Sequence, residues 1–325
     1  MNPADIWPEL ESEPGVRGMY RRRVHPDSVT DLYLVVYKPE NTRGLLIDVD
    51  LSQDDLGELP SGRGIDLRWV PKASGQAIEL VLSQRADADL FDALVADVAL
   101  AAAQGADERE AAVRVAARVK RWQTFLRETG AGLDSQRQRG LYGELYLLHK
   151  QLTPVVGIEA AVNAWVGPSG APQDFSFGAL AVEAKATIAN QHQHIRIASE
   201  RQLDTTALND LVVFHLSIDG REGTGETLPK LVDEIRAALP AGVEPRFEDG
   251  LFDSGYLDAH QPLYRTGYTP RTVNLFRIAQ GFPRLIESDC IPGVGDVSYS
   301  IAVSALSAFN IDAARFRSIL LAAVS

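Results

Sequence analysis

Two charged residues lie side by side in an apolar segment of the sequence. Glu183 and Lys185 are separated by one residue within the strand-like run 178–188, and residues i and i+2 of a strand project to the same face. A carboxylate and an ammonium group on an apolar strand are costly to bury unless they are paired or bind a metal ion. Lysine is also scarce, with 6 residues against 26 arginines. The pair alone is a weak signal of a functional site, and it gains weight from the residues around it.

Two further carboxylates precede this pair at positions that can bring them close to it. Asp174 is nine residues before Glu183, a spacing that fits a hairpin turning at Gly178. Glu144 lies at the edge of the apolar stripe of a predicted helix, 136–152. Carboxylate oxygens are the ligands that Mg²⁺ prefers, and Mn²⁺ can substitute for it. We therefore expect a divalent-metal site in which the lysine acts on a metal-bound water or offsets charge on a phosphoryl group.

Polar residues that follow this strand are candidates for contacting a substrate. Gln193 precedes the predicted strand 194–198, while Ser199 and Gln202 lie at the start of a predicted helix, 200–208. Helix N-termini bind anions such as phosphate, so we expect these three side chains to lie near a substrate phosphate. The alternative roles are a helix cap and an exposed polar residue.

The surrounding elements predict an α/β fold in three regions. Region 1–134 is predicted as a small antiparallel sheet followed by helices, and it is a candidate for binding DNA or a partner protein. Region 135–240 is predicted as the α/β core and region 241–325 as an α+β extension. The predicted core elements are 136–152, 174–177, 180–188, 194–198, 200–208, 211–218 and 228–239. The predicted flanking elements are strands 31–37, 44–49, 65–70 and 77–82, helices 87–104 and 107–128, strands 272–280 and 297–306, and helix 311–323.

Composition limits the class of protein. The 325 residues are 45% hydrophobic with a net charge of −12, which fits a globular protein and not one that coats nucleic acid by bulk charge. The single cysteine, Cys290, excludes an internal disulfide framework and a Cys-rich zinc site. Residues 1–15 are acidic with three prolines, unlike a signal peptide, and no apolar run reaches the ~18 residues of a membrane span. We expect a cytoplasmic protein.

Four short stretches carry a recognisable order of motifs. They are Gly140–Leu145 (GLYGEL), Gln173–Phe177 (QDFSF), Val182–Lys185 (VEAK) and Ile197–Leu203 (IASERQL). With them, segment 136–218 resembles the PD-(D/E)xK nuclease superfamily, which has the restriction-endonuclease-like fold. Within that superfamily it is similar to the bacterial PD-(D/E)xK motif proteins found with phage-defence genes. The residue before Asp174 is Gln173, where the motif has proline.

The resemblance implies an α-β-β-β-α-β core with a mixed central sheet and Mg²⁺-dependent hydrolysis of phosphodiester bonds. It implies that Asp174 and Glu183 are metal ligands and that Lys185 is the catalytic lysine. Glu144 would complete or support the metal shell. DNA is the implied substrate, and other defence proteins, such as an ATPase or helicase and a methyltransferase, are the implied partners. A homodimer would suit cleavage of both strands of a duplex.

Alternative interpretations remain at this stage. For the whole chain they are a non-catalytic scaffold or DNA-binding subunit of a defence complex that keeps the nuclease fold, and an unrelated metal hydrolase. A nucleotide-driven enzyme is disfavoured because no glycine-rich phosphate loop follows a strand. For single residues, the alternatives are a surface ion pair for Glu183 and Lys185, a turn or helix cap for Asp174 and an exposed position for Glu144.

Overall fold

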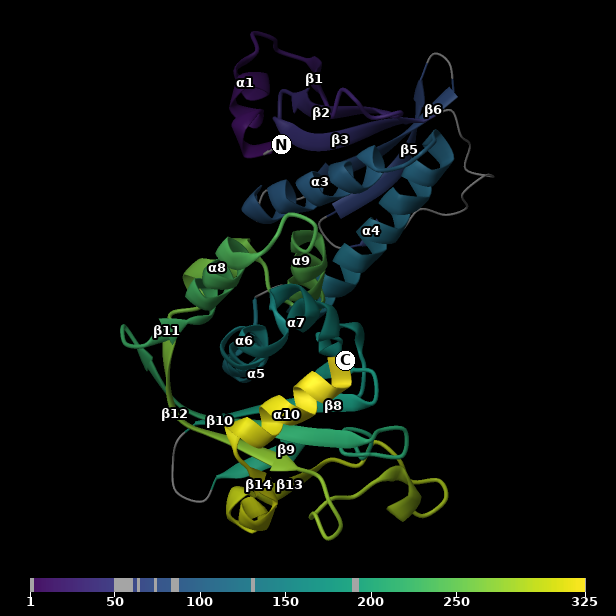
Figure 1. Cartoon of the computed structure of the whole chain (residues 1–325). Coiled ribbons are helices and arrows are strands. Elements are labelled where there is room, and N and C mark those ends of the chain that lie inside the picture. Colours follow the sequence, from purple (N-terminus) through teal and green to yellow (C-terminus); the bar gives the residue numbers. More distant parts are fainter. Residues whose placement is uncertain are drawn as a thin grey trace. The chain divides into compact units, whose positions relative to one another are not determined.

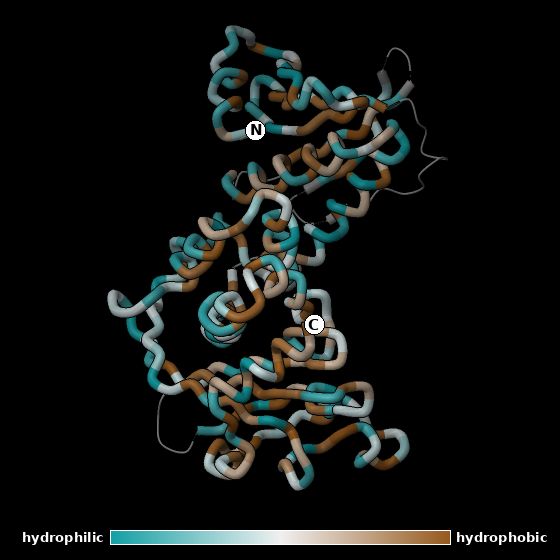
Figure 2. The backbone as a smooth tube through the Cα atoms, viewed as in Figure 1, coloured by the Kyte–Doolittle hydropathy of each residue, from teal (hydrophilic) through white to brown (hydrophobic). Residues whose placement is uncertain are grey.

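In the computed structural model, residues 3–49, 61–62, 65–72, 75–82, 88–129, 132–188 and 193–324 are described. The chain forms two compact units, Met1–Gly130 and Ala131–Ser325 (Figure 1). Hydrophobic residues concentrate in the strands of both units (Figure 2). Each unit therefore buries a core of its own.

The N-terminal unit contains a six-stranded antiparallel sheet followed by two long helices. Its elements are α1 (Trp7–Ser12), β1 (Gly18–Val24), β2 (Asp31–Lys38), β3 (Thr42–Val49), β4 (Ser61–Gly62), β5 (Ile65–Lys72), β6 (Gly75–Leu82), α3 (Ala88–Ala103) and α4 (Glu108–Thr129). The strand order is β1-β2-β3-β6-β5-β4, and α3 and α4 contact this sheet (Figure 1). Leu32, Leu34 and Val36 alternate along β2 and are fully buried. The predicted sheet followed by helices is confirmed; Asp87, the predicted start of the first helix, lies outside the described residues.

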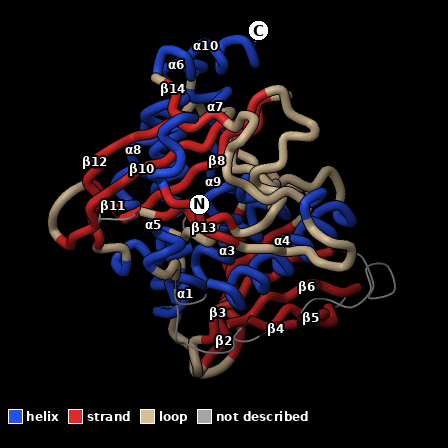
Figure 3. The backbone as a smooth tube through the Cα atoms, turned by 90° about the horizontal axis from the view of Figure 1, so that it is seen from below, coloured by secondary structure: helices blue, strands red, loops and turns tan. Residues whose placement is uncertain are grey.

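The C-terminal unit is built on a mixed central sheet. Its strands are β7 (Phe175–Phe177), β8 (Leu180–Ile188), β10 (Asp210–Glu222), β11 (Glu226–Thr227), β12 (Thr266–Arg277) and β14 (Asn310–Ile311). The order is β11-β12-β10-β8-β7, with β14 beside β12. Strands β8 and β10 are parallel and the other pairs antiparallel. Strands β12, β10 and β8 lie side by side in Figure 3. Residues 211–218 of β10 are all buried, as expected for a central strand covered on both faces.

Helices pack on one face of this sheet and a small second sheet on the other. The helices are α5 (Ser135–Tyr146), the π-helix η3 (Leu147–Leu152), α6 (Thr153–Val156), α7 (Ile158–Ala164), α8 (Leu228–Ala238), α9 (Glu244–Asp253) and α10 (Ala313–Val324). Phe214 and Leu216 of β10 belong to the helical core, whereas Leu211 and Val213 face the core of the small sheet. No helix of the described part of the chain combines the length and the apolar character needed to cross a membrane.

The predicted α/β class with a mixed central sheet is confirmed, but two details of the predicted order are wrong. The third strand, β9 (His194–Ile197), does not join the central sheet; it pairs with β13 (Tyr299–Ala302). The predicted helix 200–208 is a series of turns. In this stretch side chains bond to backbone groups instead: Gln202 accepts from the amide of Ala198 and Asp204 from that of Thr206. Such bonds compete with helix formation.

Candidate metal and catalytic site

A glycine brings helix α5 close to strand β8. An ideal Cβ on Gly143 would lie 2.8 Å from the Cβ of Ala186, so any larger residue would push the two elements apart. Asp134 fixes the start of the helix, because its carboxylate accepts from the amides of Gln136 and Arg137. The close packing carries Glu144, the next residue of α5, to the edge of β8.

The hairpin of β7 and β8 places Asp174 beside the Glu-Ala-Lys sequence. Phe175 pairs with Val182, so continuing this antiparallel register by one residue sets Asp174 opposite Glu183. The Oδ2 of Asp174 accepts from the amide of Ala184 at 2.7 Å, and its carbonyl accepts from the amides of Val166 and Gly167, both at 2.9 Å. These bonds hold the carboxylate at the strand edge.

Glu183 and Lys185 share one face of β8, as predicted. The Nζ of Lys185 lies 2.6 Å from Oε1 of Glu183, and only 1% of the Glu183 side chain and 16% of the Lys185 side chain are exposed. Neither carboxylate oxygen of Glu183, however, accepts a hydrogen bond of regular geometry from a described residue. The ammonium of Lys185 therefore contacts one carboxylate oxygen, and lone pairs of the carboxylate remain for a further ligand.

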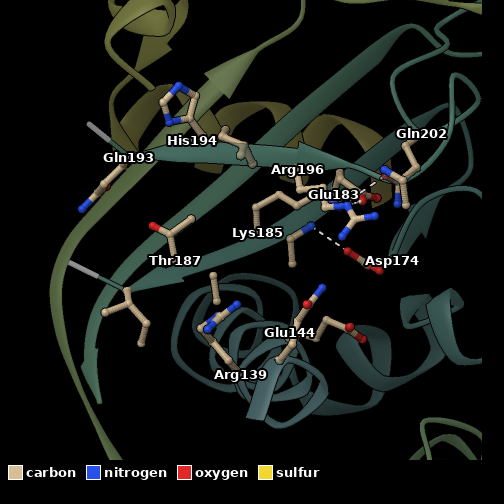
Figure 4. A pocket seen from close by; sticks show the side chains of 17 residues that line it. Arg139, Glu144, Asp174, Glu183, Lys185, Thr187, Gln193, His194, Arg196 and Gln202 are labelled. Atoms are coloured by element: carbon tan, nitrogen blue, oxygen red, sulfur yellow. Dashed lines mark hydrogen bonds and ion pairs between the residues drawn. The ribbon is translucent and has the colours of Figure 1, made fainter. Parts of the chain in front are cut away.

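A cleft of about 740 Å³ opens where β8 runs past its short neighbour. Strand β7 pairs only with residues 180–182, so within the described residues the other edge of 183–188 has no strand beside it. Helix α5 lines one side of this edge and β9 the other (Figure 4). Glu144, Asp174, Glu183 and Lys185, all predicted as site residues, line this one cleft.

The three predicted substrate residues lie differently. Gln202 lines the cleft, and its Oε1 accepts from the amide of Ala198 at 2.8 Å and from Nζ of Lys185 at 3.4 Å. Gln193 lies at the opposite end (Figure 4), where its Nε2 donates to Oγ of Ser217 at 2.7 Å. Ser199 is not among the lining residues, and the helix on which its phosphate-binding role depended is absent.

Comparison with known proteins identifies the family. Residues 4–304 match the model of a family described as "Putative PD-(D/E)XK family member, (DUF4420)". The chain belongs to this family. No curated protein and no solved structure matches it. The predicted resemblance to PD-(D/E)xK nucleases is thereby confirmed, over nearly the whole chain and not only over the four motifs.

The electrostatics of this PD-(D/E)XK site favour an added cation. Burial and the charge of Asp174 raise the pKa of Glu183, which Lys185 lowers in part, to about 8. Burial likewise raises the pKa of Asp174, although Lys185 and the amide of Ala184 oppose this. Burial and Asp174 hold the pKa of Glu144 well above its usual range. Burial lowers the pKa of Lys185, but Glu183 and Asp174 more than offset this, so the amine stays protonated.

The residues present fit a hard divalent ion of the kind that PD-(D/E)xK nucleases generally use. The carboxylate oxygens of Glu183 and of the adjacent Asp174 are of the kind that Mg²⁺ binds together with waters. Among the described residues no three carboxylate, histidine or cysteine side chains converge tightly enough to hold one ion together. Glu144 instead accepts from Nε1 of Trp165 at 2.9 Å, and its role as a third ligand stays a prediction.

Several residues of the site were not predicted from the sequence. Trp165 fixes the carboxylate of Glu144, and Arg139, Thr187 and Arg196 line the cleft (Figure 4). Trp165 is adjacent to the site only because it forms an isolated bridge with Phe175. No local sequence pattern predicts such a contact. Arg139 gives no local signal either, because it is five residues before Glu144 and not at the i+3 or i+4 spacing of neighbours on a helix face.

Proposed function

We propose that this protein is a metal-dependent endodeoxyribonuclease. The observation that carries the proposal is the convergence of Asp174, Glu183 and Lys185 in one cleft, with the carboxylate of Glu183 buried and in an ion pair with Lys185. Family membership supports a nuclease-like protein. An inactive fold has no physical need to bury these charges together, because buried charge without a ligand is destabilising.

The chain's own residues divide the work of phosphodiester hydrolysis. Asp174 and Glu183 would hold the metal ion, which when bound polarises the phosphodiester and acidifies a water. Lys185, protonated and 2.6 Å from Glu183, keeps its positive charge at the site, where it stabilises the negative charge that develops on the phosphoryl oxygens. Gln202 orients the lysine through its Oε1. Glu144, held by Trp165, adds a second acidic group at the edge of the metal site.

The biological setting is part of the proposal. The similarity to PD-(D/E)xK motif proteins found with phage-defence genes supports a role in bacterial restriction or phage defence. Such a role would place DNA, and with it an ATPase or helicase and a methyltransferase, among the partners. Two copies of the chain would be needed for two metal sites to cut both strands of a duplex, which supports a homodimer on the substrate.

The test is cleavage of supercoiled plasmid DNA in Mg²⁺ or Mn²⁺ by the purified protein and by Glu183→Gln and Lys185→Met. Loss of a metal ligand or of a charge at the reacting phosphate typically costs about 10²-fold or more in rate. We expect both variants to lose cleavage to at least that degree. Glu159→Gln and Lys230→Met, which change exposed residues of the same unit, are the matched controls and should cut like the wild type.

Each outcome decides between functions. Metal-dependent cutting that persists in both site variants would contradict the assignment of Glu183 and Lys185. Cutting of RNA in a parallel reaction, without cutting of DNA, would change the substrate class. Absence of cutting in every form, with Mg²⁺ still bound by the wild type, would replace the nuclease by a scaffold or DNA-binding subunit that keeps the nuclease fold.

A further inference from the structure

Two arginines line opposite sides of the cleft without an acidic partner. Arg139 is half-buried on α5, and Arg196 is exposed on β9. Both side chains extend toward the space beside β8 (Figure 4). Neither forms an ion pair with a carboxylate of the described residues, although Glu144, Asp174 and Glu183 line the same cleft.

The position of these two arginines, beside three carboxylates with which they form no ion pair, sets them apart. The chain carries 44 acidic against 32 basic residues, and several other arginines pair with carboxylates. Arg236, for example, pairs with both Glu248 and Asp258, at 2.7 and 2.9 Å. Two guanidinium groups in one cleft, neither paired with a carboxylate of the described residues, indicate a site for an anion that is not part of the protein.

The α5 side of the cleft, which carries Arg139, also leaves space for a ligand next to the helix. Gln136, Arg139, Gly140 and Glu144 line the cleft, and their spacing of three, four and eight residues places them on one face of α5. An ideal Cβ on Gly140 would meet no atom within 4 Å. The helix surface between the arginine and the acidic site therefore carries no side-chain bulk at Gly140.

We infer that Arg139 and Arg196 bind the phosphodiester backbone of the strand to be cut and hold it from both sides of β8. This inference rests on the proposed nuclease function and assigns two substrate-binding residues to it. A guanidinium group presents a planar fork of donors that matches two phosphate oxygens. Because they lie on opposite walls, the two arginines contact phosphates on either side of the scissile bond and fix that bond over Asp174 and Glu183.

The experiment measures binding separately from cleavage. A fluorescently labelled DNA strand, and the duplex made from it, are titrated with full-length protein in Ca²⁺ at several salt concentrations. The proteins compared are the wild type, Arg139→Ala, Arg196→Ala, the corresponding lysine variants and Arg137→Ala. Arg137 is the matched control, because it is exposed on the same helix but does not line the cleft.

We expect each cleft alanine variant to bind DNA about tenfold or more weakly at low salt. The slope of log affinity against log salt should fall by about 1 for each arginine removed. Lysine should restore the slope but only part of the affinity, because it keeps the charge without the fork. Arg137→Ala should bind like the wild type. Thermal melting of every variant checks that it is folded.

The outcomes separate this inference from the proposed function. If the wild type cuts DNA and both alanine variants bind and cut equally well, the nuclease stands and the inference is overturned. If no form cuts DNA but the arginine variants lose binding with the expected change of slope, the inference stands without the nuclease. Equal losses in Arg137→Ala, or no binding of either DNA by the wild type, overturn the inference.

Discussion

Glu183 is the residue on which the site depends most. It is 1% exposed, it stands next to the parallel strand β10, and among the described residues it forms an ion pair with Lys185. Burial raises the pKa of Glu183 most and the charge of Asp174 adds to this, to about 8, although Lys185 lowers it in part. One ammonium group thus faces an excess of negative charge from the two carboxylates. A divalent ion would remove that excess.

The raised pKa predicts how metal binding depends on pH. Because the folded-state pKa of Glu183 lies above the ordinary value of 4.5, its contribution to stability is present below about pH 4.5 and is lost as the pH rises through about 8. A metal ion needs the ionised form, so its affinity should increase by up to about tenfold per pH unit as the pH approaches 8. Thermal melting with and without Mg²⁺ should show a larger upward shift in Tm at pH 8 than at pH 6.

The control for this measurement removes the ligand and keeps the fold. Asp174→Asn should lose the Mg²⁺-dependent shift at both pH values, whereas Lys230→Met should keep it. A shift that is equal at pH 6 and pH 8 would mean that Glu183 is not the group that titrates with metal binding.

The residues at the centre of the site were predictable and those around them were not. Glu183 and Lys185 follow from the period of two in a strand, and Asp174 follows from a hairpin spacing; both are local rules. Trp165 reaches the site through an isolated bridge with Phe175, and Arg196 lies on β9, which pairs with β13 about a hundred residues further along the chain. A single sequence carries no signal for such contacts.

At the scale of elements, the contact of α5 with β8 determines where Glu144 lies. Gly143 allows this contact, while Gly140, three residues earlier in the same helix, faces open space. An added methyl group should therefore change the stability of the protein in opposite directions at the two positions, although alanine favours the helix equally at both.

We predict that Gly140→Ala stabilises the protein by about 0.5–1 kcal/mol, because alanine loses less conformational entropy in a helix than glycine. Gly143→Ala should destabilise it by about 1 kcal/mol, since the cost of overpacking against Ala186 exceeds the gain in helix propensity. Urea unfolding of the two variants beside the wild type measures both changes. Equal stabilisation by both substitutions would show that a methyl group at position 143 fits between α5 and β8 without overpacking.

The errors of sequence interpretation at this scale have a common cause. Segment 200–208 has helical composition, but Glu200 uses its buried carboxylate to accept from the amides of Asp296 and Val297, at 3.3 and 2.8 Å. Strand β9 pairs with β13, about a hundred residues further along the chain. The partners of β9 and of Glu200 lie in the segment 296–302, which the local pattern does not reveal. The bonds of Gln202 and Asp204 to nearby amides also compete with the helix.

At the scale of the whole molecule, the α/β class followed from the order and type of the elements, but the extent of the core did not. Residues 241–325, predicted as an extension, supply β12 to the central sheet next to β10. They also supply Phe247, Tyr268, Leu275 and Phe316 to the same hydrophobic core as α5 and β8. The cleft and its lining residues all lie in the unit Ala131–Ser325.

This arrangement predicts which parts of the chain fold independently. A fragment of residues 132–325 should unfold cooperatively and keep the proposed Mg²⁺-dependent rise in Tm, because it contains the whole sheet, its core and the residues proposed to hold the metal ion. A fragment of residues 132–240 should not fold, because it leaves the edge of β10 unpaired where residues 212–222 meet β12 and removes the core side chains that follow. Circular dichroism during thermal melting, with the full chain as control, distinguishes the two. Cooperative unfolding of the shorter fragment would show that region 135–240 is a domain by itself; failure of the longer one would show that the nuclease unit needs residues 1–130 to fold.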